Sequence, residues 1–177
     1  MQWFLMRHGR DPEDFRGGWS SHSLTEQGRR EVVEAAKNIQ ELDFELILSS
    51  DLARARETAE IIARVCKKPL YLDVALREIN NGDLAGLAND LAEKKYPNLY
   101  YKNLAFTESY PNGESPKAFF ERMKQLYENM QAMEKNCLFI THGGVIEALY
   151  CLHEGLDFSN KTSHIKLDHA EVLTFTF

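Results

Sequence analysis

Short apolar runs alternate along this chain with stretches in which apolar residues recur every three or four positions. The short runs are typical of buried strands, and the recurring stretches are typical of helices that pack on a sheet. The last run alternates apolar and polar residues, as a strand with one buried face does. Strands that alternate with helices predict an α/β sandwich with a mostly parallel sheet. We expect the strands at Trp3–Met6, Leu46–Leu48, Leu70–Leu72, Cys137–Thr141 and Glu171–Phe177.

The helical stretches have recognisable starts. Thr25 is a good N-cap for a first helix whose apolar residues extend to Leu42. The pattern predicts further helices over 51–66, from about 115 to 133, and over 144–152. Residues 76–115 contain Asn-Asn-Gly and two Tyr-Pro pairs, so this segment is expected to be the least regular.

Length and composition describe one ordinary globular unit. The 177 residues contain no internal repeat or linker, so we expect a single domain, 1–177, with a small cap-like insertion at about 86–111. The chain is 44% hydrophobic and 27% charged, as globular domains are. None of its apolar runs approaches the roughly 20 residues that cross a bilayer. Because the first residues lack a basic leader and a cleavage site, no secretion signal is expected.

Cysteines and charge narrow the compartment and the partners. Cys66, Cys137 and Cys151 are an odd number without Cys-x-x-Cys spacing, which indicates reduced thiols and a cytoplasmic protein. The net charge of −6 argues against nucleic acid, whose binding depends on clustered basic side chains. A small anionic ligand is compatible with this charge, because a few arginines can make a pocket locally positive.

Two histidines stand where apolar runs stop. Arg7-His8-Gly9 follows the first run, and His142-Gly143-Gly144 follows the run at 137–141. Polar side chains cost free energy to bury unless they have partners or a task. In parallel sheets, ligands bind outside the carboxyl ends of the strands. These two junctions and Ser49-Ser50 are therefore expected to meet at one place.

The residue types at these junctions suit a phosphate group. Arg7 and Arg54 offer planar forks of N–H donors that match phosphate oxygens, and Gly143 stands at a helix N-terminus, which favours an anion. A neutral imidazole is a nucleophile, so one histidine is expected to attack phosphorus while the other, as imidazolium, neutralises the transition state. Glu78 is a candidate donor of the proton that the leaving alkoxide needs.

Five ordered segments resemble the histidine phosphatase superfamily, which includes the cofactor-dependent phosphoglycerate mutases. They are Met6-Arg-His-Gly9, Ser49-Ser-Asp-Leu-Ala-Arg54-Ala, Leu76-Arg-Glu78 with Gly82-Asp-Leu-Ala-Gly86, Gly113-Glu-Ser115 and Thr141-His-Gly-Gly144. The resemblance implies that His8 is the nucleophile that becomes phosphohistidine and that Glu78 is the proton donor. It implies a phosphate pocket of Arg7, Arg54 and His142. It also implies a mixed, mostly parallel six-stranded sheet with helices on both faces.

The segment after the first histidine departs from the family pattern. The family often has Glu-Thr or Glu-Ser there, followed by an asparagine that touches the phosphate. This chain has Arg10 and Asp11, with Asp14 at the asparagine's place, and Ser21-His22-Ser23 where Asp-x-Pro is usual. An ionised Asp14 would repel a phosphate, so either the loop takes another route or Asp14 faces a cation. Candidates to line the mouth, against the alternative of a solvated loop, are Arg10, Arg16, Trp19 and His22.

Each site residue also has an ordinary structural interpretation. His8 alone would more often be a structural histidine. Arg54 alone would more often lie on the surface or pair with Asp51 or Glu57, and Glu78 has Arg77 as a possible ion-pair partner. No His/Cys/Asp cluster has metal-ligand spacing, so neither a metal nor another cofactor is expected. The other histidines have no evident partner and are interpreted as structural or surface residues: His22, His153, His164 and His169.

Three functions compete for this constellation. The leading hypothesis is a phosphatase that takes phosphate from a small phosphorylated metabolite onto His8 and then gives it to water. A mutase would return the phosphate to another hydroxyl, and it needs a lid that excludes water. The modest insertion at 86–111 favours hydrolysis over that alternative. A non-catalytic phosphate-binding module is the third hypothesis. The joint retention of five residues argues against it: Arg7, His8, Arg54, Glu78 and His142.

Overall fold

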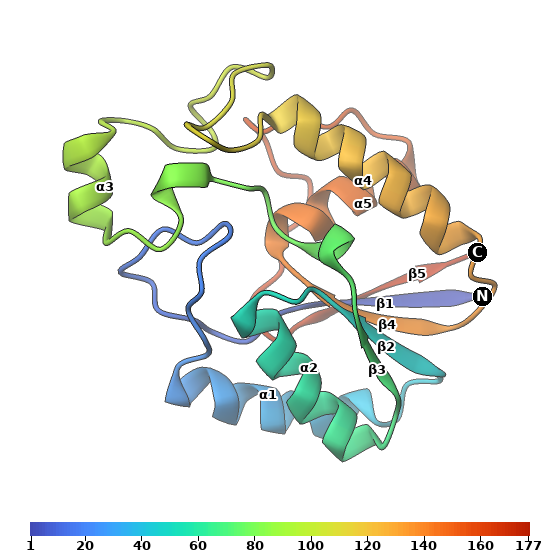
Figure 1. Cartoon of the computed structure of the whole chain (residues 1–177). Helices are drawn as coiled ribbons and strands as arrows, with labels where there is room; N and C mark the ends of the chain where they lie inside the picture. Colours follow the sequence, from blue (N-terminus) through green and yellow to red (C-terminus); the bar gives the residue numbers. More distant parts are fainter.

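A five-stranded sheet lies between two helical layers in the computed structural model, which describes residues 1–177 (Figure 1). The strand order is β3-β2-β4-β1-β5, and every neighbouring pair is parallel except β1 and β5. The predicted mixed, mostly parallel sheet is confirmed. The expected sixth strand is absent, because only the five segments with strand patterns pair: β1 Gln2–Arg7, β2 Leu46–Ser49, β3 Leu70–Leu72, β4 Cys137–Thr141 and β5 Val172–Thr176.

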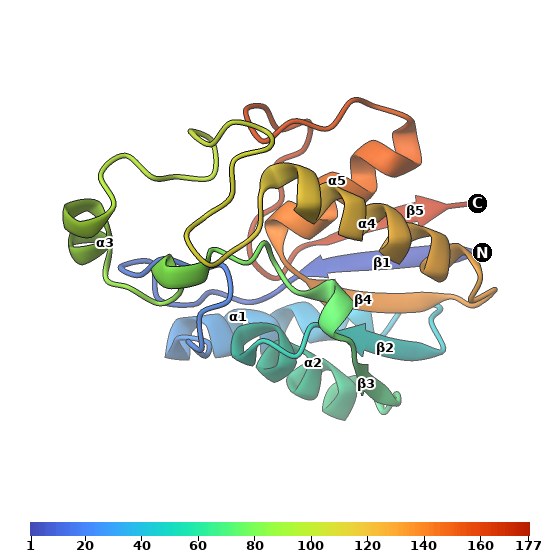
Figure 2. The same ribbon diagram turned by 45° about the horizontal axis from the view of Figure 1, so that its top comes forward.

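Two helices cover each face of the sheet (Figure 2). On one face lie α1, Glu26–Ile39, and α2, Ala53–Cys66; on the other lie α4, Pro116–Gln131, and α5, Gly143–Glu154. The side chain of Thr25 caps α1 by accepting a hydrogen bond from the N–H of Gly28. Ser115 caps α4 in the same way. These caps satisfy backbone donors that the first turn of a helix leaves free.

Alternation along β1 divides the hydrophobic core into two halves. Trp3 and Leu5 pack toward α4 and α5, whereas Phe4 and Met6 pack toward α1 and α2. This is the period-two pattern of a strand buried on both faces. All five residues of β4 are buried as well. Strands β1 and β4 are thereby packed on both faces, and this packing positions the residues that follow their carboxyl ends.

The start of α2 differs from the prediction by two residues. The sequence pattern placed it at Asp51, but the helix begins at Ala53 and Leu52 is its N-cap. The carboxylate of Asp51 does not cap the helix because both of its oxygens bind the guanidinium of Arg77, at 2.6 and 2.5 Å. This shorter helix places Arg54 in the first turn, beside the end of β1.

The segment at 76–115 is irregular, as predicted, but it contains a short helix that the sequence pattern did not indicate. This helix, α3, spans Asn89–Lys95 and has no side-chain cap, and seven residues are too few to establish a helical period. The segment is joined to the loop at 10–23 by backbone hydrogen bonds: Arg16 donates to Leu87, and Gly86 donates to Arg16. Figure 1 shows this loop, in blue, beside the green segment.

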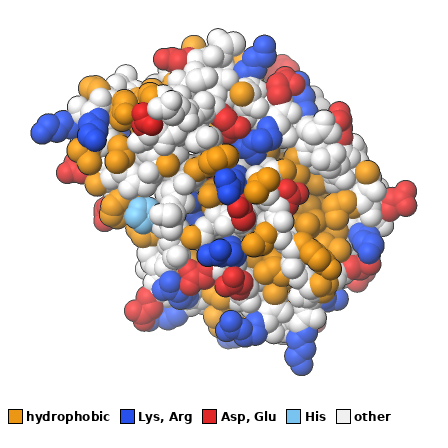
Figure 3. Space-filling view, viewed as in Figure 1, with side chains coloured by type: hydrophobic (Ala, Val, Ile, Leu, Met, Phe, Trp, Pro, Cys, Tyr) orange, Lys and Arg blue, Asp and Glu red, His pale blue; other side chains and the backbone are white.

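The edge of the sheet formed by β3 is partly apolar at the surface. Hydrophobic side chains gather over the β3 side of the molecule in Figure 3, where Tyr71, Leu72 and Val74 are exposed. None of the helices combines the length and the apolar character that crossing a bilayer requires.

Candidate active site

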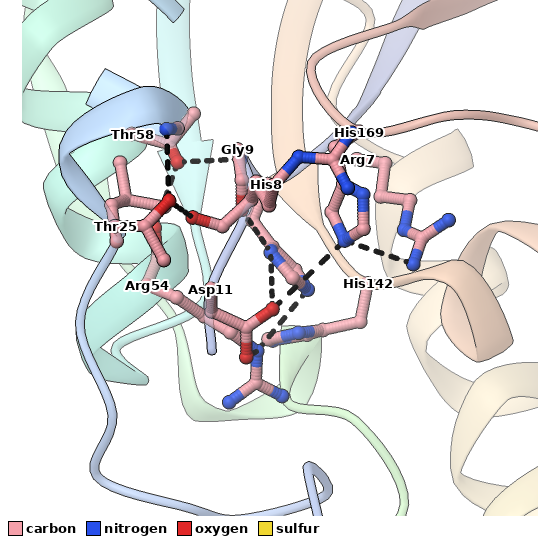
Figure 4. A network of polar contacts seen from close by, with 12 residues as sticks. Arg7, His8, Gly9, Asp11, Thr25, Arg54, Thr58, His142 and His169 are labelled. Atoms are coloured by element: carbon pink, nitrogen blue, oxygen red, sulfur yellow. Dashed lines mark hydrogen bonds and ion pairs between the residues drawn. The ribbon is translucent and has the colours of Figure 1, made fainter. Parts of the chain in front are cut away.

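The register of β1 and β4 brings the two junction histidines together. Arg7 is paired with Thr141, so the next residues, His8 and His142, leave adjacent strands at the same level. Their ring centroids are 5.0 Å apart, and both side chains are buried (Figure 4). Arg54 reaches the same point from α2, with Nε 3.1 Å from Nε2 of His8. The predicted convergence of histidines and arginines is present in the structure.

Hydrogen bonds fix the tautomer of His8. Its Nδ1 lies 2.7 Å from the backbone oxygen of Gly9, which can only accept, so Nδ1 carries the proton. Its Nε2 accepts from Arg54 and therefore holds the lone pair. Burial lowers the pKa of His8 well below its usual 6.5, and the charge of Arg54 adds to this effect. The result is a neutral imidazole with an unprotonated Nε2, the form that a nucleophile requires.

His142 and Arg7 leave two buried nitrogen atoms without partners. Nε2 of His142 lies 2.9 Å from the hydroxyl of Ser50, but its Nδ1 is unpaired, and so is Nε of Arg7. An unmet buried polar group costs about 1–3 kcal/mol, so the two atoms mark a place that suits a polar ligand. Gly143, the first residue of α5, lies beside Arg7, where a Cβ would come within 3.7 Å of Nε.

The imidazolium that the sequence predicts belongs to the transition state, whereas the structure gives the charge of His142 before a phosphate arrives. Burial lowers its pKa well below 6.5, followed by the effects of Arg54 and His8, so the ring is neutral rather than an imidazolium. Sequence analysis could not anticipate this because it did not reveal how deeply the ring is buried. A phosphate dianion nearby would favour protonation of this ring.

Arg7 is held by a segment from the far end of the chain. Its Nη1 donates to the backbone oxygen of Leu167 at 2.8 Å, and its Nη2 lies 3.1 Å from Nε2 of His169. His169 was interpreted from the sequence as structural or surface. It in fact forms part of the cavity wall, with its ring centroid 5.5 Å from that of His8. No sequence spacing could reveal a contact between residues 162 positions apart.

The carboxylate beside the two histidines is that of Asp11 and not that of Asp14. Asp14 is exposed and does not line the cavity. Asp11 lines it instead, with oxygens 3.6 Å from Nε of Arg54 and 3.9 Å from Nδ1 of His8. The same carboxylate is 3.9 Å from Nε2 of His169 (Figure 4). Asp11 is therefore a negative group next to the place that suits a phosphate.

Glu78 is positioned by two backbone N–H groups. One oxygen accepts from Ile79 at 3.0 Å and the other from Gly144 at 3.1 Å. A Cβ at Gly144 would collide with this carboxylate, so a side chain at that position would displace Glu78. The alternative ion pair with Arg77 does not form, because Arg77 is bound to Asp51. Glu78 thus faces the cavity.

One cavity of about 640 Å³ unites the site. It is lined by five of the predicted residues, Arg7, His8, Arg54, Glu78 and Gly143, and His142 is packed beside His8. The candidate mouth residues are placed differently. Arg10 pairs with Glu13 and Glu31, His22 packs on Phe15, Trp19 packs on Arg77, and Arg16 lines a neighbouring cavity.

The fold also gathers two groups of metal-type donors that sequence spacing did not show. They are His8, Asp11 and His169, and Glu147, Cys151 and His164. Nδ1 of His8 donates to a backbone oxygen and has no lone pair for a metal. Both oxygens of Glu147 accept hydrogen bonds from the segment at 163–165. Both groups are thus engaged in hydrogen bonding, and the second anchors the wall that carries Leu167.

A sequence profile of the histidine phosphatase superfamily (branch 1) matches residues 3–177. The chain belongs to this superfamily. It is 32% identical over 166 residues to a 2,3-bisphosphoglycerate-dependent phosphoglycerate mutase of Bartonella bacilliformis, over 86% of this chain and 81% of the relative.

Solved structures agree with this membership. Mycobacterial glucosyl-3-phosphoglycerate phosphatase with inorganic phosphate is 26% identical, with a TM-score of 0.81 over 99% of this chain and 89% of that chain. The alpha-ribazole phosphatase of Shigella flexneri is 23% identical and has a TM-score of 0.85, over 98% and 89% of the two chains. The second likeness concerns the fold alone.

The position of Asp11 predicts the effect of removing its charge from this histidine phosphatase superfamily member. Asp11→Asn should bind inorganic phosphate about tenfold more tightly, because like charges about 4 Å apart repel by roughly 1–4 kcal/mol. Calorimetric titration with phosphate at neutral pH measures this. Asp14→Asn, outside the cavity, is the matched control and should bind as the parent does. Weaker binding by Asp11→Asn would show that the carboxylate supports the anion site.

The lowered pKa values predict how the site responds to pH. The His8 ring should stay neutral as pH falls through about 6.5, where histidines of unfolded chains take up a proton. The unfolded state then binds more protons, so the free energy of unfolding should decrease below that pH, by up to about 1.4 kcal/mol per unit for each buried histidine. Nitrogen-15 NMR of the rings and urea titrations measure the two effects. A folded-state transition of His8 near 6.5 would contradict this.

Proposed function

We propose that this protein is a phosphomonoesterase that hydrolyses a small phosphorylated metabolite through a phosphohistidine at His8. The observation that carries the proposal is the unprotonated Nε2 of His8 beside Arg54 and two unpaired buried nitrogens, those of Arg7 and His142. A tetrahedral anion would satisfy these nitrogens together. Membership of the histidine phosphatase superfamily supports the same reaction.

In the first step, the lone pair of His8 Nε2 forms a bond to phosphorus as the bond to the ester oxygen breaks. Arg7, Arg54 and His142 hold the phosphoryl oxygens, whose charge increases in the transition state. The alcohol leaves with the bonding electron pair and takes a proton from Glu78, which must first be protonated. No metal is required by this sequence of steps, because the charges come from the side chains.

In the second step, water replaces the alcohol. Glu78, now ionised, accepts a proton from water, whose oxygen attacks phosphorus as the bond to Nε2 breaks. Inorganic phosphate leaves, and His8 returns to its neutral form. Glu78 thus acts as the acid in the first step and as the base in the second, as microscopic reversibility requires of a double displacement.

Phosphoglycerate mutase activity is a second candidate, because a curated relative at 32% identity carries that name. We infer that 86–111 serves as a small cap, with α3 as its one helix, and that it covers the site too little to keep water from the intermediate. Supplying 3-phosphoglycerate with 2,3-bisphosphoglycerate separates the two functions. A hydrolase releases inorganic phosphate, whereas a mutase forms the isomeric monophosphate.

We also propose a reducing, cytoplasmic setting for this reaction. None of the three cysteines forms a disulfide, and Cys137 and Cys151 are buried. Burial raises the pKa of both thiols to about 11, so they stay protonated and unreactive.

Replacing the nucleophile gives the most direct prediction. His8→Ala should abolish turnover of an aryl phosphate and should form no acid-labile phosphoprotein when it is mixed with labelled substrate. The fold should persist, since the sheet is held by the residues that precede His8. Phosphate release and acid-quench labelling measure both effects. His22→Ala, outside the cavity, should match the parent, and full activity of His8→Ala would disprove the mechanism.

The role of Glu78 predicts a dependence on the leaving group. Glu78→Gln should slow hydrolysis of alkyl phosphates by about 10²–10⁴-fold, the range expected for losing a general acid. It should slow formation of the phosphoenzyme from p-nitrophenyl phosphate much less, because nitrophenolate departs without a proton. Rapid-quench measurement of that first step isolates it from the later water attack. Equal losses for both ester classes would mean that another group is the acid.

A further inference from the structure

A second cavity of about 320 Å³ adjoins the first one at Glu78. It shares part of its wall with the phosphate cavity, namely Gly17, Gly18, Glu78 and Gly144. Its remaining wall is largely aromatic and aliphatic, with Tyr100, Tyr101 and Tyr110 prominent. An alcohol that takes its proton from Glu78 leaves beside this second cavity.

Unpaired polar atoms gather at this cavity as they do at the phosphate site. Six buried side-chain polar atoms in the molecule have no hydrogen-bond partner. Two belong to Arg7 and His142, and Trp3 Nε1 lies in the core. The other three are Arg16 Nε, Arg16 Nη2 and the hydroxyl of Tyr101, and both residues line the second cavity. Unmet buried groups on one wall indicate a polar ligand that meets them.

The free atoms of Arg16 have a specific geometry. Nε and Nη2 form one edge of the guanidinium plane, and their two N–H bonds point the same way, as a carboxylate requires for a bidentate pair. The guanidinium is fixed by Tyr100, whose ring centroid lies 3.8 Å from Cζ. Its nearest anion, Glu93, is 3.7 Å from Nη2, beyond hydrogen-bond distance, and is about half exposed. Neither Nε nor Nη2 of Arg16 has a hydrogen-bond partner, and Nη2 has only this long ion pair, so the forked edge is available to a closer bidentate partner.

The tyrosines provide neutral polar contacts. Burial raises the pKa of Tyr110 to about 12, and it raises the pKa of Tyr101 further. Both hydroxyls therefore stay protonated at neutral pH. Tyr101 can donate its unpaired hydroxyl proton to a ligand oxygen, and it does so without adding negative charge to a region that already contains Glu78.

We propose that the second cavity binds the alcohol part of the substrate and that Arg16 forms a bidentate pair with a carboxylate on that alcohol, assisted by the hydroxyl of Tyr101. The substrate class is then a compact phosphomonoester that also carries a carboxylate. This proposal rests on the proposed function, since it assigns the leaving group to the space beside Glu78.

Charge and size favour a carboxylate over a second phosphate. Glu78 lines this cavity and Glu93 is near Arg16, so a dianion would meet more repulsion than a monoanion. The volume is at the small end of the range for ligand sites, which run from about 300 to 1,000 Å³.

Binding of stable phosphonates tests the proposal without any turnover. Alkylphosphonates and ω-carboxyalkylphosphonates of two to four carbons differ at one end only, and calorimetry gives their dissociation constants. At least one carboxylated member should bind about tenfold or more tightly than its alkyl counterpart. A matching series of alkyl bisphosphonates tests the second-phosphate alternative. The assignment of a carboxylate is wrong if no carboxylated phosphonate binds more tightly than its alkyl counterpart. It is also wrong if the second phosphonate group increases the affinity more than the carboxylate does.

Variants show which residues cause the tighter binding of the carboxylated phosphonate, called here the carboxylate gain. Arg16→Gln should lose it while binding the plain alkylphosphonate as the parent does, and Arg16→Lys should keep only part of it, because lysine lacks the fork. Tyr101→Phe retains the aromatic ring but lacks the hydroxyl, so its affinity for the carboxylated phosphonate should fall several-fold. Arg10→Gln, in the same loop but paired with Glu13 and Glu31, is the control and should keep the full gain. A gain that survives in both Arg16 variants would overturn the proposal.

The two proposals fail in different ways. If the carboxylate gain is present but no phosphoester is hydrolysed and no phosphohistidine forms, the hydrolase proposal fails while the subsite stands. If esters are hydrolysed through His8 but neither the gain nor its dependence on Arg16 is observed, the subsite proposal fails alone. Thermal unfolding of each variant identifies a misfolded Arg16→Gln, in which case Tyr101→Phe and Arg16→Lys decide the outcome.

Discussion

Parallel pairing of β1 with β4 is the constraint on which the rest of the site depends. The ladder ends with Arg7 opposite Thr141, and a slip of one residue would turn the side chains of β1 to the other face of the sheet. Such a slip is very unfavourable because Trp3 and Leu5 pack in one half of the core, whereas Phe4 and Met6 pack in the other. Hydrophobic packing, which does not touch the ligand, thereby fixes the distance between the two histidines.

Electrostatics at the site follow from burial more than from charge. Two neutral imidazoles lie beside two guanidinium groups, and the pKa of each ring is lowered first by desolvation and then by Arg54. The same cluster contains the Asp11 carboxylate, which offsets part of the positive charge. Under the proposed function, an arriving phosphate would meet N–H donors whose orientation the fold has already set, so binding would need little reorganisation.

Much of this arrangement could be predicted from the sequence, and the exceptions have physical reasons. Apolar periodicity located the five strands and four long helices, because burial determines that pattern. The Arg-His-Gly and His-Gly-Gly junctions located the candidate site, since the strand ends of a parallel sheet meet. The sixth strand was implied by resemblance alone, and α3 is too short to show a period. Contacts between distant segments, such as Arg7 with His169, leave no local signal at all.

The hydrogen bonds that join Arg16 to Leu87 and Gly86 have a consequence for how such an enzyme can change. The loop at 10–23 and the segment at 86–111 are hydrogen-bonded to each other, so a mutation that reshapes one of them would also disturb the other. A change of substrate specificity should thus require mutations in both segments together. The sheet beneath should tolerate replacement of the two segments at the same time. Grafting both loops together onto a related scaffold is the corresponding route for engineering.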